Sequence, residues 1–75
     1  MSRSEWERHV VTMCSDAWQL GPYVTKKVVE GLEFLVVSDS VSDFTVAEVL
    51  CGVGVDGAEA EMAAPGIRAT IKRSR

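Results

Sequence analysis

Long apolar runs are absent from this sequence of 75 residues. None approaches the roughly 20 residues that a helix needs to cross a bilayer. Residues 2–5 are polar, and the apolar segment of a secretory signal does not follow them. The length suits one hydrophobic core, and the apolar share of 47% is typical of globular chains. We therefore expect a single domain over residues 1–75, located in the cytoplasm.

Cysteine and histidine are scarce, since the chain has only Cys14, Cys51 and His9. Each cysteine lies in an apolar segment, which is more typical of a small buried side chain in a reducing compartment than of a disulfide. A metal site would need further ligands at paired spacings, and the sequence has no such pair. We expect neither a bound metal ion nor a cofactor.

Catalytic groups at recognisable spacings are also missing. No serine or cysteine is accompanied by a base and an orienting group. The segment Gly52-Val53-Gly54 lacks the preceding strand and the lysine of a phosphate-binding loop. We therefore expect a protein without enzymatic activity.

Basic residues are absent from a span of forty residues, Val28 to Ile67. The same span contains eight acidic residues: Glu30, Glu33, Asp39, Asp43, Glu48, Asp56, Glu59 and Glu61. Such a surface either only keeps a small protein in solution or complements a basic surface on a protein partner. The compensating cations are Arg68, Lys72, Arg73 and Arg75. They form either an ordinary exposed end or a tail that contacts phosphates.

Residues 4–20 have the pattern of an amphipathic helix. Ser4 followed by Glu7 predicts a capping box at its start, and Gly21-Pro22 is a typical end. One apolar row consists of Trp6, Val10, Met13, Ala17 and Leu20, and a second consists of Val11, Cys14 and Trp18. Together the rows cover about half the circumference. A stripe this wide predicts a helix that either lies between two neighbours or is shared with a second copy of the chain.

A second amphipathic helix is predicted from about Tyr23 to Leu35, where apolar residues recur at helical spacing. Residues 34–37 have strand-like composition and Gly31 weakens a helix, so residues 32–37 are compatible with either structure. A polar loop over residues 38–43 follows.

The third predicted helix begins at a cap formed by Asp43 or Thr45 and extends to about Leu50. A turn over residues 52–55 ends it.

The fourth predicted helix begins at Asp56 as cap and covers residues 57–64, where Pro65-Gly66 stops it. Residues 67–71 alternate between apolar and polar side chains, which predicts a short strand. The expected fold is mainly α, a small bundle of three to four helices with an optional short C-terminal strand.

Residues 44–49 read Phe-Thr-Val-Ala-Glu-Val, and Gly54, Val55, Asp56 and Ala58 follow them. From Thr45 to Ala58 this pattern resembles the core of the helix-turn-helix superfamily of transcriptional regulators, and its winged-helix members in particular. The resemblance implies that Gly54 forms the turn, that Asp56 begins the recognition helix, and that Ala58 packs inside it. It also implies binding to DNA.

The expected recognition helix departs from this pattern, because it carries Glu59 and Glu61 and no Arg, Lys, Asn or Gln. Those four residue types make most contacts to bases, and cations are needed at phosphates. The recognition helix is therefore predicted to repel DNA rather than to read it.

Two functions from different classes follow. The first is a non-enzymatic regulatory or inhibitory module that contacts a protein through an acidic face, and the charge placement favours it. Its candidate interface residues are Glu48, Asp56, Glu59, Glu61, Trp18 and Val11. The alternative is a small DNA-binding transcriptional regulator, with contacts from Arg68, Lys72, Arg73 and Arg75. A homodimer through residues 4–20 is compatible with both.

Overall fold

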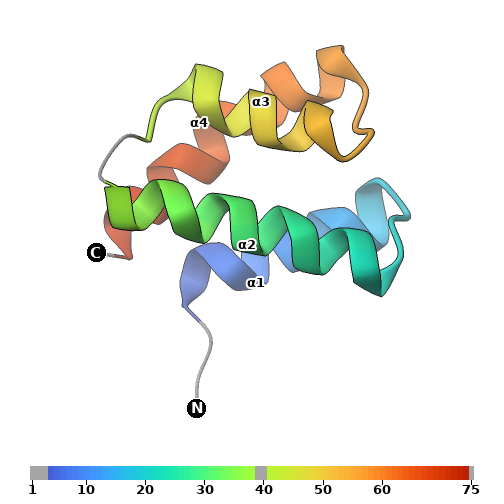
Figure 1. The fold of residues 1–75 in the computed structure, drawn as a ribbon, viewed down its shortest axis with the longest axis horizontal. Helices are drawn as coiled ribbons and strands as arrows, with labels where there is room; N and C mark the ends of the chain where they lie inside the picture. The colour runs from blue at the N-terminus through green and yellow to red at the C-terminus, as the bar shows by residue number, and fades with distance from the viewer. Residues whose placement is uncertain (1–3, 39–40, 75) are drawn as a thin grey trace.

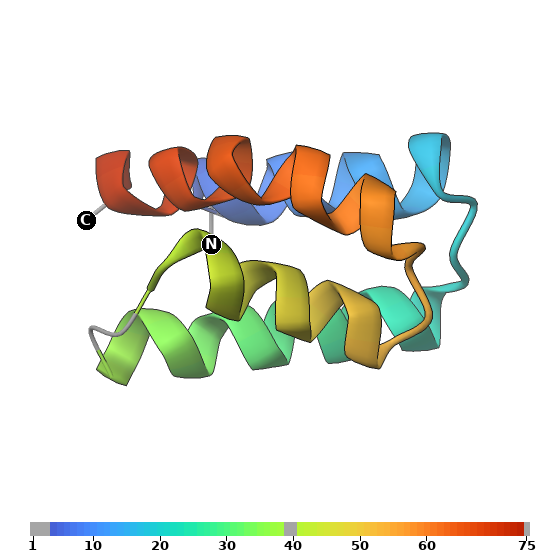
Figure 2. The same cartoon turned by 90° about the horizontal axis from the view of Figure 1, so that it is seen from above.

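The computed structural model describes residues 4–38 and 41–74. These residues form α1 (Glu5–Thr12), a π-helical turn η1 (Met13–Ala17), α2 (Pro22–Ser38), α3 (Asp43–Gly52) and α4 (Gly57–Arg73). Successive helices run in opposite directions along the molecule (Figure 1). They form two layers, α1 with α4 and α2 with α3 (Figure 2). The expected mainly α fold is confirmed.

Most of the wide apolar stripe of the first helix is covered by other helices of the same chain. Trp6 and Val10 of its first row and Cys14 of its second row are buried, while Val11 and Trp18 are half-buried. The helix packs against both α2 and α4. The helix therefore lies between two neighbours of the same chain.

The core between the layers combines small and branched side chains. The pair α3 and α4 packs most extensively, because α4 presents alanines in its first half and isoleucines in its second. Small side chains let two helices approach closely. The buried apolar residues are Trp6, Val10, Cys14, Val28, Leu32, Val46, Leu50, Val55, Ala60, Ala64, Ile67 and Ile71.

The end of the first helical segment differs from the prediction. The backbone N–H of Trp18 donates to the Met13 carbonyl at 2.9 Å, which closes a π-type turn. The left-handed residue that follows is Gln19, with φ of 53°, and not a glycine. The Leu20 N–H then donates to the Cys14 carbonyl at 2.6 Å. The chain therefore leaves the helix two residues before the predicted glycine.

Gly21 and Pro22 begin the second helix instead of ending the first. Pro22 is the first residue of α2, where its missing N–H would have no partner inside the helix in any case. At the other end of the first helix, Ser4 has the extended backbone of an N-cap, but its side chain makes no capping hydrogen bond. The predicted capping box of Ser4 with Glu7 is therefore wrong.

Residues 32–37, left open by the sequence, are helical and belong to α2. Burial of Val28 and Leu32 against the other helices outweighs the strand preference of the residues that follow. The polar loop after α2 is described only from residue 41 onward, and residues 39–40 lie outside the described part.

The third helix begins one residue earlier than predicted, since its cap is Ser42 and not Asp43 or Thr45. The Thr45 N–H donates to the Ser42 Oγ at 3.3 Å, and the Ser42 N–H donates to the Thr45 Oγ1 at 2.9 Å. Thr45 is thus the second partner of a capping box.

The turn between α3 and α4 agrees with the sequence prediction. Gly54 has a positive φ of 102°, a conformation that favours glycine. Asp56 caps α4, because its side chain accepts a hydrogen bond from the Ala58 N–H at 3.2 Å.

The fourth helix is longer than predicted and continues through Pro65-Gly66 to Arg73. The predicted strand over residues 67–71 is therefore wrong. The helical row of buried residues continues across the proline, which is itself exposed. Burial of the second half of the helix offsets the hydrogen bond that proline cannot make. The buried apolar row consists of Ala60, Ala64, Ile67 and Ile71.

The two cysteines have different surroundings. Cys14 is buried, as expected, and burial raises the pKa of its thiol, against a smaller lowering by a hydrogen bond with Thr25. Cys51 is exposed on α3, so its predicted burial is wrong. Leu50, the apolar residue before it, is buried in the core instead.

Candidate protein-interaction surfaces

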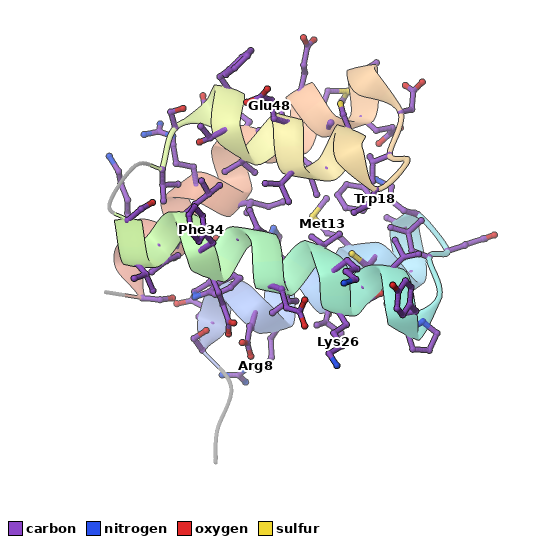
Figure 3. The ribbon with its side chains drawn as sticks, viewed as in Figure 1. Arg8, Met13, Trp18, Lys26, Phe34 and Glu48 are labelled. Carbon is purple, nitrogen blue, oxygen red and sulfur yellow. The ribbon has the colours of Figure 1, made fainter. Side chains whose placement is uncertain are left out.

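Four of the predicted interface residues lie on α3, α4 and the turn between them. Glu48 projects from α3 away from the bundle (Figure 3). Asp56 lies before α4, and Glu59 and Glu61 follow in its first two turns. All four side chains are exposed. We refer to these four residues as the acidic surface.

The other two predicted interface residues lie elsewhere. Trp18 is half-buried against the core, and its Nε1 is buried without a hydrogen-bond partner among the residues that the structure describes. Val11 lines a groove between α1 and α2. Val11 therefore belongs to α1 and to this groove, whereas Trp18 is the residue that follows η1.

Three of the four predicted DNA contacts lie on the second half of α4, and two of these three are ion-paired within the chain. Arg68 pairs through its Nε with the carboxylate of Asp43 at the start of α3. Arg73 pairs with Glu5 of α1, with Nη2 and Oε1 3.3 Å apart. Lys72 is exposed, and Arg75 lies outside the described residues. These arginines therefore connect α4 to other helices.

The charges of α4 change sign along the helix. Glu59 and Glu61 lie near its N-terminus, and Lys72 and Arg73 in its last turn. This order complements the helix dipole, which favours anions at the start and cations at the end. It also keeps cations away from the first half of α4, where the helix-turn-helix resemblance places groove contacts.

A shallow groove of about 230 Å³ lies beside the acidic surface, between α3 and α4. Phe44, which is 71% exposed, forms part of its lining together with Glu61 and Pro65. Met62 on α4 is 80% exposed. Phe44 was not among the interface residues predicted from the sequence, because large aromatic side chains are more often buried than exposed.

A larger groove of about 600 Å³ lies between the first two helices. Its lining consists of Glu7, Val11, Ser15, Pro22, Thr25, Lys26, Val29, Glu30 and Glu33. Val11 was predicted from the sequence to lie at an interface, whereas Glu7 was predicted to be part of a helix cap. The alternation of acidic and apolar residues on both helices was a signal for this groove, but only their antiparallel packing brings the two sets together.

Two carboxyl groups meet across this groove. A hydrogen bond with the Glu7 carboxyl raises the pKa of Glu33 above its ordinary value, and burial and the nearby charges of Glu7 and Glu30 raise it further. Like charges held close together favour the protonated form of one of them. The groove therefore has an acidic end at which a cation is electrostatically favoured.

Comparison of the chain with protein-family models, with curated proteins and with solved structures finds no match in any of the three. Within the described residues, no helix is both long and apolar enough to span a bilayer. The same residues contain no group of three histidine, cysteine or acidic side chains placed to hold a metal ion.

Proposed function

We propose that this chain is a small non-enzymatic regulatory or inhibitory module that binds a basic surface of a protein partner. The observation that carries the proposal is that every described carboxylate between Val28 and Ile67 is exposed. Asp43 is engaged by Arg68, whereas the acidic surface has no ion pair among the described residues. Opposite charge on a partner would speed its encounter and select it over acidic competitors.

The exposed apolar side chains support the same proposal. Phe44 and Met62 lie on the helices that carry the acidic surface. Protein interfaces combine buried aromatic and methionine side chains with a charged rim. Phe44 would supply an anchor, and the carboxylates would supply the rim.

DNA binding, the alternative, has weaker support. The element order at residues 45–58, helix, tight turn and helix, suits the resemblance. However, Arg68 and Arg73 are occupied by carboxylates of the same chain, and the first half of α4 is acidic. A polyanion would have to displace those carboxylates before it gained either arginine.

Affinity capture followed by binding kinetics tests the proposal. The protein is immobilised, captured proteins are identified by mass spectrometry, and association is measured at several salt concentrations. The variant Glu59→Lys/Glu61→Lys should slow association by about tenfold and flatten its salt dependence, because rim charges act mainly on encounter. An unchanged rate and salt slope would reduce the acidic surface to a solvated face.

The matched control changes exposed residues of the first helical segment. Thr12→Lys/Asp16→Lys raises the net charge by three units, against four for Glu59→Lys/Glu61→Lys, at exposed positions of α1 and η1. Association that slows equally in this control would reveal dependence on net charge alone, which contradicts a role for the acidic surface.

A further inference from the structure

The groove between α1 and α2 is long enough for a peptide. One side extends from Glu7 to Ser15 and the other from Pro22 to Glu33. At the rise of an α-helix these sides are about 12 and 16 Å long. A peptide helix of two to three turns spans about the same length.

The two ends of the groove have different chemistry. The two helices are antiparallel (Figure 1). The pair of Glu7 and Glu33 therefore marks one end of the groove, and the lining residues Ser15 and Pro22 belong to the other end. Val11 and Val29, both half-buried, supply apolar surface between the ends.

The charge of the lining is negative. Among the described residues, the charged members of the lining are Glu7, Glu30, Glu33 and Lys26, and the formal sum of these four charges is −2. Lys26 precedes Glu33 by two turns of α2 and points away from the bundle (Figure 3). The acidic end therefore keeps an excess of carboxylates, and an anionic ligand such as a phosphate would be repelled there.

We propose that this groove binds a basic segment of a protein partner, with an arginine at the Glu7–Glu33 end and an apolar side chain over Val11 and Val29. The inference rests on the proposed function, because it takes the occupant to be a protein. A guanidinium can donate to two carboxylates at once, and its weakly hydrated plane and apolar stem suit a half-enclosed groove. Its positive charge would relieve the repulsion between the two carboxylates.

The experiment uses the full chain, labelled with nitrogen-15, and a synthetic probe. The probe is a helical peptide of about ten residues, or about 15 Å, with two arginines beside two leucines on one face and alanine elsewhere. Its binding is followed by amide chemical shifts. The proposal predicts shifts within residues 7–15 and 22–33, with few on α3 and α4.

Isosteric variants test the two carboxylates. Glu7→Gln/Glu33→Gln should weaken peptide binding about tenfold, as expected for the loss of charge-assisted hydrogen bonds. This variant is expected to fold, because it removes a repulsion. Glu59→Gln/Glu61→Gln makes the same change in net charge on α4 and should leave peptide affinity within about twofold, since these exposed charges lie outside the groove.

Three outcomes would overturn the groove assignment. Shifts centred on α3 and α4, weakened by Glu59→Gln/Glu61→Gln, would keep the proposed function and move the binding site. Equal affinity for a probe with serine in place of leucine would show simple counter-ion attraction. No binding of the probe would also overturn the groove assignment. The proposed function would then depend on the affinity-capture experiment described above.

Discussion

The backbone of Gly31 in α2 lies directly against the side chain of Val49 in α3. A Cβ placed on Gly31 would be 3.0 Å from the Val49 Cγ1, closer than ordinary van der Waals contact. Glycine inside a helix costs about 1 kcal/mol relative to alanine. In this protein the glycine allows α2 and α3 to approach each other closely, which offsets that cost. Residues of α2 also form one wall of the proposed binding groove.

Substitution of two helical glycines by alanine should separate the effect of helix propensity from the effect of packing between helices. Gly66 lies inside α4 with no atom within 4 Å of an added Cβ. Gly66→Ala should therefore raise the free energy of unfolding by about 0.5–1 kcal/mol. Gly31→Ala should lower it, because Val49 has to move. Urea unfolding measures both, and equal stabilisation by the two variants would show that α2 and α3 adjust freely.

The turn that resembles a helix-turn-helix turn makes its own prediction. Gly54→Ala places a side chain on a residue with φ of 102° and should cost about 1 kcal/mol or more. Gly52 is the last residue of α3, has no positive φ and has open space around it. Gly52→Ala is the matched control and should be neutral or stabilising in thermal unfolding. A loss of stability at both positions would implicate the whole segment and not the backbone of Gly54.

Sequence alone predicts several parts of this fold that depend on local chemistry. Gly54 and Asp56 were predicted as turn and cap, because a positive φ and a side-chain acceptor are properties of single residues. The mainly α class followed from helical spacing of apolar residues. Two local predictions failed, the capping box at Ser4 and the cap of α3, whereas the errors at Cys51 and in the second half of α4 depend on tertiary contacts.

The second half of α4 shows why. Pro65-Gly66 is a strong local stop signal, and residues 67–71 fit a strand as well as a helix. The choice between helix and strand depends on the burial of Ile67 and Ile71 on the same helix face as Ala64. That burial requires the other helices to be in place. The α1–α2 groove was missed for the same reason, since Glu7 and Glu33 are 26 positions apart and meet only after packing.

Pro65 offers a direct test of that balance. Alanine at this position would supply an N–H for the carbonyl four residues earlier and would relieve the ring's clash with it. Pro65→Ala should raise the free energy of unfolding by about 1–3 kcal/mol, because the proline is exposed and loses little packing when replaced. Chemical denaturation measures this change. A loss of stability would mean that α4 is shaped around the proline.

The carboxyl pair in the groove predicts a pH dependence. The folded-state pKa of Glu33 is raised, so between pH 4.5 and that raised value the folded protein binds more protons than the unfolded chain. This contribution to stability is present at low pH and is lost as the pH rises through the window. Glu33→Gln should reduce the slope of unfolding free energy against pH there and increase stability at neutral pH.

Urea unfolding at closely spaced pH values measures that slope. Neutralisation of Glu59 on α4 tests whether a change in net charge alone has the same effect. An unchanged slope in Glu33→Gln would mean that the two carboxyl groups do not share a proton across α1 and α2.

Binding to DNA is separable from protein binding through the ion pairs of α4. At physiological salt we expect no sequence-specific complex with duplex DNA, and only weak binding at low salt. Glu5→Gln/Asp43→Asn releases Arg73 and Arg68 from their partners and removes two negative charges. This variant should bind mixed duplex DNA more tightly in a mobility-shift assay, with a steeper salt dependence, because each additional phosphate contact adds about one unit to the salt slope. Lys72→Ala, which removes an exposed cation, should reduce that slope by about one unit.

A defined site bound by the unmodified protein at nanomolar concentration, and protected in a footprint, would instead favour the transcription-factor alternative. Such a complex would require the acidic first half of α4 to lie away from the groove of the DNA, since Glu59 and Glu61 would repel its phosphates.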